Sequence, residues 1–158
     1  METIFLGCDH AGFSLKQNIL AFLTNMSVQV RDLGSDHGDA SVNYPEYAHK
    51  VVRAVLANPG SRGILICGTG LGMSMAANRF PGIRAALCQE IYTARMSRLH
   101  NDANLLVMGG RIVGPGLAQE IVLTWLTTPF EGGRHQQRLE LIETLSNQSL
   151  EYPEGDPT

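Results

Sequence analysis

Short apolar runs alternate with amphipathic segments along most of the chain. The apolar runs cover residues 3–7, 28–32, 63–67, 83–88 and 105–108, and each has the length of a buried strand. Apolar residues at helical spacing predict helices over residues 14–25, 47–56, 74–78, 91–99, 117–127 and 134–145. Strands that alternate with helices favour a parallel sheet with helices on both faces. We therefore expect an α/β fold, a three-layer α/β/α Rossmann-like arrangement with a five-stranded parallel sheet and an additional C-terminal helix.

Length and composition indicate one globular domain. The chain of 158 residues is long enough to bury a core, and we place the domain at residues 1–146, followed by a disordered tail at residues 147–158. The net charge of −3 gives no electrostatic footprint for nucleic acid. No apolar run approaches the ~18 residues of a membrane span, and the first residues lack the basic start of a signal peptide. We expect a cytoplasmic protein that binds neither nucleic acid nor membranes.

The chain has three cysteines, Cys8, Cys67 and Cys88. Their odd number and the lack of C-x-x-C spacing indicate neither a disulfide framework nor a zinc site. We expect reduced thiols and no bound metal.

A glycine-rich turn follows the apolar run that ends at Cys67, and helix-compatible residues follow the turn. This order presents backbone N–H groups and a helix N-terminus to an anionic ligand. Cys67 would stand beside the positive end of that helix, where thiolate is favoured over thiol. The alternative is a tight turn with a buried structural cysteine, since free cysteines are often buried. The turn alone leaves both interpretations open.

The glycines of this turn do not complete a nucleotide-binding fingerprint. Met73 follows Gly68, Gly70 and Gly72 where a dinucleotide-binding fold has its third glycine, and no Gly-Lys-Ser/Thr follows as in a P-loop. This spacing disfavours hydride transfer on a dinucleotide.

Ionisable residues follow three of the predicted strands at the point where each strand ends. In open parallel sheets, ligands bind at the carboxyl ends of the strands. We expect three segments to gather at that edge, namely Cys8-Asp9-His10, Cys67-Gly68-Thr69 and Gly109-Gly110-Arg111. His100 precedes the last strand and lies nominally at the opposite edge. A functional His100 would need an unusual connection or a neighbouring subunit.

Several of the candidate residues also have simple structural interpretations. Asp9 could cap the helix that follows it. His37 and His49 are expected at the solvent, and Met73 and Met75 are expected in the core.

Arg134 and Arg138 are four residues apart, so a helix would place both guanidinium groups on one face. Taken alone, such a pair is more often a solvated face than a phosphate clamp. Arg134-His135 directly after Gly132-Gly133 makes the clamp more credible.

Several motifs, in this order along the chain, together resemble the ribose-5-phosphate isomerase B family, which also includes the allose-6-phosphate and galactose-6-phosphate isomerases. The similarity runs from about residue 4 to residue 145, and no single motif carries it. The matching segments are GCDHAG at residues 7–12, CGTGLG at 67–72, AAN at 76–78, SRLHNDAN at 97–104 and EGGRHQQR at 131–138.

The resemblance implies an aldose–ketose isomerase that acts on a sugar phosphate through a cis-enediolate, without a metal or other cofactor. It implies that Cys67 is the base that moves the proton from C2 to C1, and Thr69 is a plausible hydroxyl partner of its thiolate. It also implies that His100 opens the sugar ring, a role that suits imidazole near pH 7.

The resemblance further implies the residues that hold the substrate. Asp9, His10 and Asn101 would contact the sugar, and phosphate would bind to Arg111, Arg134 and Arg138. Backbone N–H groups of the glycine-rich turn would stabilise the developing oxyanion. That turn comprises Gly68, Thr69, Gly70, Leu71 and Gly72.

One branch of the family has glycine at the position of Cys67 and a glutamate base at the position of Met73, so this chain resembles the cysteine branch. Family members are homodimers or homotetramers with shared sites, which would bring a neighbour's His100 to Cys67. A hexose-6-phosphate isomerase and a non-catalytic sugar-phosphate-binding or nucleotide-binding module remain the alternatives. Retention of both Cys67 and His100 disfavours the module, since binding alone does not require a thiol.

Overall fold

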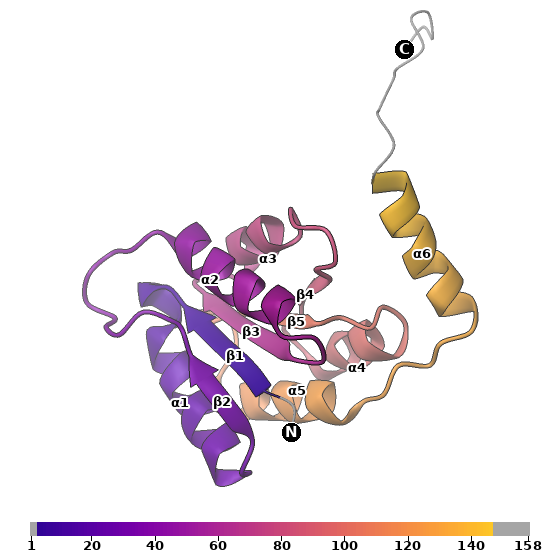
Figure 1. The fold of residues 1–158 in the computed structure, drawn as a ribbon. Helices are drawn as coiled ribbons and strands as arrows, with labels where there is room; N and C mark the ends of the chain where they lie inside the picture. Colours follow the sequence, from indigo (N-terminus) through magenta and orange to yellow (C-terminus); the bar gives the residue numbers. More distant parts are fainter. Residues whose placement is uncertain (1–2, 147–158) are drawn as a thin grey trace, which may run out of the picture.

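The computed structural model describes residues 3–146, which form a five-stranded parallel sheet between two layers of helices (Figure 1). The strands lie in the order β2-β1-β3-β5-β4. They are β1 (Thr3–Cys8), β2 (Gln29–Asp32), β3 (Arg62–Cys67), β4 (Ala85–Leu87) and β5 (Leu105–Gly109). The helices are η1 (His10–Gly12), α1 (Phe13–Asn25), α2 (Tyr44–Ala57), α3 (Leu71–Ala77), α4 (Ile91–Leu99), α5 (Pro115–Thr127) and α6 (Arg134–Ser146). The predicted three-layer α/β fold is confirmed.

Both faces of the sheet are buried beneath helices. α2 and α3 cover one face, and α1, α4 and α5 cover the other (Figure 1). Successive side chains of a strand point to opposite faces. Ile64 and Ile66 of β3 therefore pack towards α1 and α5, whereas Leu65 and Cys67 pack towards α2 and α3. This alternation directs the Cys67 sulfur towards the start of α3.

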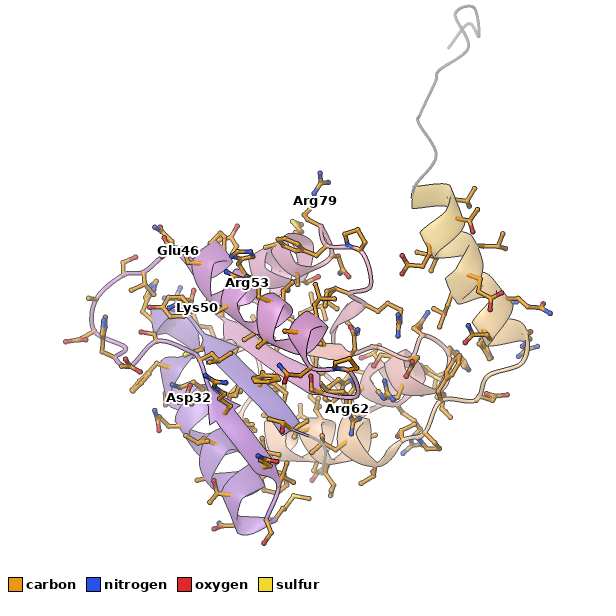
Figure 2. The ribbon with its side chains drawn as sticks, viewed as in Figure 1. Asp32, Glu46, Lys50, Arg53, Arg62 and Arg79 are labelled. Carbon is orange, nitrogen blue, oxygen red and sulfur yellow. The ribbon has the colours of Figure 1, made fainter. Side chains whose placement is uncertain are left out.

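The amphipathic pattern of α2 shows why its position could be read from the sequence. Val51, Val52 and Val55 are buried against the sheet. Figure 2 shows polar side chains on the opposite face, among them Glu46 and Lys50. Such a pattern at helical spacing fixes which face of a surface helix meets the core.

Three helices begin two or three residues earlier in the chain than the apolar pattern predicts. α2 and α5 have Pro45 and Pro115 in their first turns, where proline is well tolerated because its missing N–H has no partner there. α3 begins at Leu71 rather than at residue 74, directly after Gly70 with φ +82°. The glycine-rich turn is therefore shorter than predicted, and the helix N-terminus lies closer to Cys67.

The expectation that both Met73 and Met75 pack in the core is wrong for Met75. Met73 is fully buried, but the side chain of Met75 is 68% exposed. Positions two apart on a helix point about 200° apart, so they do not share a face.

α6 lies outside the two layers that flank the sheet (Figure 1). Residues 128–133 lead to it from α5, and Gly132 and Gly133 take left-handed conformations with φ +69° and +57° directly before the helix. The predicted disordered tail at residues 147–158 lies outside the described residues. The predicted domain boundary at residue 146 therefore stays a prediction. Within residues 3–146, no helix combines the length and apolar character of a membrane span.

Candidate active site

Three turns lie together at the carboxyl edge of the sheet, as the strand pattern predicts. The N–H of Gly110 donates to the carbonyl of Cys67 at 2.7 Å, and the N–H of Arg111 donates to that of Gly68 at 3.0 Å. On the other side of β3, the N–H of Asp9 donates to the carbonyl of Ile66 at 3.2 Å. The turns after β1, β3 and β5 are thus joined by main-chain hydrogen bonds.

Glycines allow these turns to approach backbone to backbone. A Cβ on Gly12 would lie 2.2 Å from the Ile66 carbonyl oxygen, and one on Gly110 would lie 2.9 Å from the Ala11 carbonyl oxygen. A side chain at Gly12 would have to move the end of β3, and one at Gly110 would have to move the backbone of η1. The scarcity of side chains keeps main-chain groups exposed to a ligand at this edge.

Cys67 lies at the centre of these turns. Its side chain is buried, and its sulfur accepts the N–H of Gly70 at 3.2 Å. This donor and the N-terminal end of α3 both stabilise negative charge on sulfur. Burial raises the pKa of the Cys8 thiol to about 11 and also raises the pKa of Cys88. Among the cysteines, Cys67 has the surroundings of a reactive thiol.

Asp9 and His10 follow β1 beside this thiol. Asp9 is buried, and its carboxylate accepts the N–H of Gly12 at 3.0 Å, so the capping interpretation holds for the short helix η1. His10 Nδ1 accepts the N–H of Val42 at 3.2 Å. A neutral His10 then carries its proton on Nε2 and can donate it to an oxygen of a ligand.

Arg111 lies beside the glycine-rich turn, and Thr69 is an exposed residue of the turn itself. A Cβ on Gly68 would lie 3.7 Å from an Arg111 Nη, which places this guanidinium beside the turn. The hydroxyl of Thr69 accepts the N–H of Leu71 at 3.4 Å. The proposed contact between Thr69 and the thiolate remains a prediction.

His100 and Asn101 lie at the other edge of the sheet. They follow α4, and a few residues later the Asn104 carbonyl accepts the N–H of Gly63 at 2.9 Å. Gly63 precedes Cys67 in β3 by about 13 Å at the usual rise of a strand. The structure therefore does not bring His100 to Cys67 within one chain.

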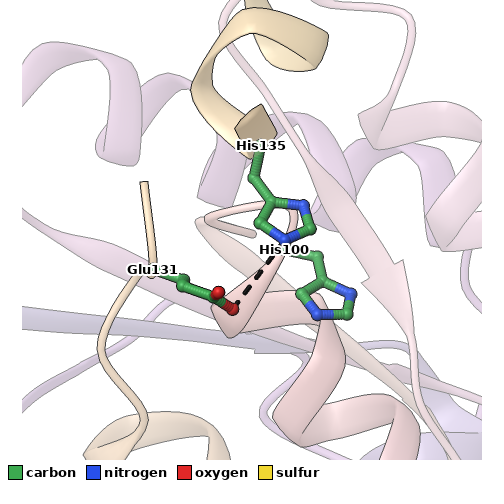
Figure 3. A group of neighbouring side chains, drawn as sticks. All are labelled: His100, Glu131 and His135. Carbon is green, nitrogen blue, oxygen red and sulfur yellow. Dashed lines mark ion pairs between the residues drawn. The ribbon is translucent and has the colours of Figure 1, made fainter. Parts of the chain in front are cut away.

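A second group of candidate residues forms where α4 meets α6. The ring of His100 stacks on His135, with centroids 4.2 Å apart and planes at 8°. Glu131 Oε2 lies 3.8 Å from His135 Nε2 (Figure 3). Arg134 and Arg138, on the same helix, are exposed. Sequence reasoning missed Glu131 and His135 as site residues, although both lie within the matched segment EGGRHQQR.

His37 and His49 are surface residues, as predicted. His37 is exposed and lies 3.3 Å from Asp39, and His49 is exposed and stacks on Phe80. The structure thus divides the candidate residues into a thiol group around Cys67 and an imidazole–arginine group around His100.

Comparison with known proteins agrees with the motifs. The family described as Ribose/Galactose Isomerase matches residues 4–142. The chain is 50% identical to ribose-5-phosphate isomerase B of Escherichia coli (strain K12) over 145 residues, which cover 92% of this chain and 97% of the relative.

Solved structures give the same result. The ribose-5-phosphate isomerase B of Clostridium thermocellum superposes with a TM-score of 0.88 at 50% identity, covering 91% of this chain and 97% of that one. A ribose 5-phosphate isomerase from Thermotoga maritima also has a TM-score of 0.88 at 50% identity, covering 90% and 98% of the two chains. On the family match, the sequence identity and the shared fold, the chain belongs to the ribose/galactose isomerase family.

Proposed function

We propose that this protein interconverts ribose 5-phosphate and ribulose 5-phosphate through a cis-enediolate, with Cys67 as the base. The observation that carries the proposal is the buried Cys67 sulfur, which accepts the Gly70 N–H at the start of α3. The identity of 50% to the Escherichia coli ribose-5-phosphate isomerase B supports the choice of substrate.

In this mechanism, the Cys67 thiolate removes the proton from C2 of the open-chain aldose and helps to return it at C1. Negative charge develops on the substrate oxygens as the enediolate forms. Backbone N–H groups of the turn at residues 68–72 donate to these oxygens, and such a donor typically contributes ~3 kcal/mol to the transition state. The balance is completed when the hydroxyl proton of O2 passes to O1, the C1–O1 double bond becomes single and the C2–O2 bond becomes double.

Sugar phosphates are mostly cyclic, so the aldehyde must first be released. We assign this step to His100, because imidazole can both accept and donate a proton near neutral pH. Asp9, His10 and Asn101 are assigned to the sugar hydroxyls. His10 suits a donor role, because its Nδ1 already accepts the Val42 N–H.

We further propose a homodimer or homotetramer in which each site combines the thiol group of one subunit with the imidazole–arginine group of another. The separation of His100 from Cys67 within one chain supports this arrangement. The exposed face of α6 supports it too, because Leu141, Ile142 and Leu145 are 56%, 54% and 59% exposed. Neighbouring apolar side chains of this size mark an interaction surface.

The phosphate is assigned to Arg134 and Arg138, with Arg111 beside the glycine-rich turn. Arg138→Ala should raise KM for ribose 5-phosphate by about tenfold or more, since a hydrogen bond to a charged group contributes about 1.5–3 kcal/mol. It should lower kcat much less, because the phosphate does not react and its contacts are the same in ground and transition states. Steady-state kinetics measure both constants.

Arg53→Ala is the matched control, since Arg53 is an exposed arginine on the outer face of α2 (Figure 2). Arg134→Ala should behave like Arg138→Ala. If KM stays unchanged in both α6 variants, these arginines form only a solvated face.

The choice of pentose over hexose can be tested directly. We expect a higher kcat/KM for ribose 5-phosphate than for allose 6-phosphate when the two are assayed side by side. A kcat/KM at least tenfold higher for the hexose phosphate would assign the chain to the hexose-6-phosphate isomerases. Binding of both sugars without turnover of either would instead indicate a non-catalytic sugar-phosphate-binding module.

A further inference from the structure

The contact between His100 and His135 is the most specific side-chain arrangement outside the thiol group. The two imidazole rings are nearly parallel, with centroids 4.2 Å apart and planes at 8° (Figure 3). His135 is 3% exposed, whereas His100 is half-buried. The ring of His135 thus forms a buried platform, and the ring of His100 lies on it with access to the solvent.

The same residues offer a set of metal-binding atoms, because ligand atoms of His100, Glu131 and His135 all lie within 4.8 Å of one another. A metal bound to an imidazole nitrogen lies along the lone pair, in the plane of the ring. Rings that are stacked at 8° have no such common point between them. The observed geometry is therefore that of an aromatic stack rather than of a metal centre.

Main-chain hydrogen bonds hold both partners of the stack, and the N–H of His135 donates to the Gly132 carbonyl at 3.1 Å. The N–H of His100 donates to the Met96 carbonyl at 2.9 Å at the end of α4. The N–H of Glu131 donates to the carbonyl of Leu99 at 3.0 Å, which ties the start of the α6 region to the residue before His100. With both backbones held, the remaining freedom of His100 is the rotation of its ring.

Charge also favours a neutral His135. Burial lowers its pKa, and so do the charges of His100, Arg134 and Arg138, while the carboxylate of Glu131 opposes the change. A neutral ring can stack against His100 in either of its protonation states without charge repulsion. The platform therefore remains available while His100 gains and loses a proton.

We propose that His135 is a positioning residue that holds the ring of the catalytic His100 in the orientation needed to open the cyclic sugar. The inference rests on the proposed function. Ring opening moves the proton of the O1 hydroxyl to the imidazole, breaks the C1–O4 bond as C1–O1 becomes a carbonyl, and returns the proton to O4. One ring nitrogen must reach both oxygens, so the orientation of the imidazole plane decides the rate.

The two directions of the reaction separate ring opening from proton transfer between carbons. Ribose 5-phosphate is mostly a furanose, whereas ribulose 5-phosphate is always open because its O5 is phosphorylated. At saturating ribose 5-phosphate, His135→Ala should lower kcat by about tenfold or more, since a misplacement of ~1 Å can cost ~100-fold. At saturating ribulose 5-phosphate, kcat should change by less than about twofold, because the open aldose can leave the site before its ring closes. The comparison uses kcat because the equilibrium constant fixes the ratio of kcat/KM between the two directions.

Substitutions that differ in ring and polarity identify what the platform supplies. His135→Phe keeps an aromatic face and should retain the forward rate to within about threefold. His135→Gln keeps polar atoms without a ring and should behave like His135→Ala. Leu139→Ala is the matched control, because Leu139 is buried one helical turn further along α6. It should affect both directions equally.

A double-variant comparison tests whether His135 acts through His100. In the His100→Ala background, His135→Ala should lower the forward rate no further. The inference is overturned by equal losses in both directions for His135→Ala, by additional loss in the double variant, or by retention of activity in His135→Gln but not in His135→Phe. Lack of turnover by the unmodified protein would instead refute the proposed function.

Discussion

Cys67→Ala should lower kcat for ribose 5-phosphate by about 100-fold or more, because the variant has no group at this position to remove the C2 proton. Substrate binding should change little, since the proposed mechanism assigns the phosphate and hydroxyl contacts to other residues. Alanine fits the space of the thiol, so the buried strand end is preserved. Stopped or continuous assays of ketose formation, with binding measured separately by calorimetry, would check both expectations.

Cys88→Ala is the control, because Cys88 is buried in the core on the opposite side of the sheet from α3. It should keep kcat. Iodoacetamide provides a second comparison, since burial raises the pKa values of Cys8 and Cys88 and slows their alkylation. Activity should fall in proportion to the modification of Cys67, which mass spectrometry measures. Full activity after modification of Cys67 would show that the base is another group.

Mixing two inactive variants should restore activity if the sites are shared between subunits. Cys67→Ala and His100→Ala homodimers each carry a lesion in every site. In a mixed dimer, one site contains both lesions and the other contains none. When the variants are refolded together in equal amounts, about half of the dimers are mixed, so roughly a quarter of the unmodified activity should return.

The same variants refolded separately and then combined under conditions that prevent subunit exchange are the control, and they should show no recovery. If Cys67 and His100 of one chain served the same site, every site in a mixed dimer would keep one lesion. Activity no higher than the average of the two variants would then rule out the shared site.

The pattern of apolar residues was sufficient to predict all five strands and the six α-helices, because each buried face imposes its own spacing on the chain. Helix starts were less accurate. α3 starts directly after the left-handed Gly70. Because the helix begins before Met73, it contains both Met73 and Met75 and turns them to different faces, so that Met75 is exposed. Apolar spacing contains neither piece of information, and it also gave no sign of the short helix η1.

The carboxyl-edge part of the site was predictable for a topological reason, since parallel strands deliver their C-terminal turns to one edge. The pairing of His100 with His135 was not, because it depends on how α6 returns to α4. His135 follows Gly132, Gly133 and Arg134 in the sequence, but only the folded chain shows that its ring faces inward while the arginine remains exposed.

Under the proposed function, the left-handed glycines before α6 make the position of its arginines adjustable in evolution and in design. A Cβ on Gly132 or Gly133 would meet no atom within 4 Å, so their requirement is one of torsion angles rather than of space. Asparagine tolerates such angles, whereas most residues lose ~1–2 kcal/mol there. Under the shared-site proposal, the torsion angles of these two glycines set the direction of α6. They thereby set where its arginines meet the phosphate in the site shared with the neighbouring subunit. Selection for a longer or shorter sugar can therefore act on residues that never touch it.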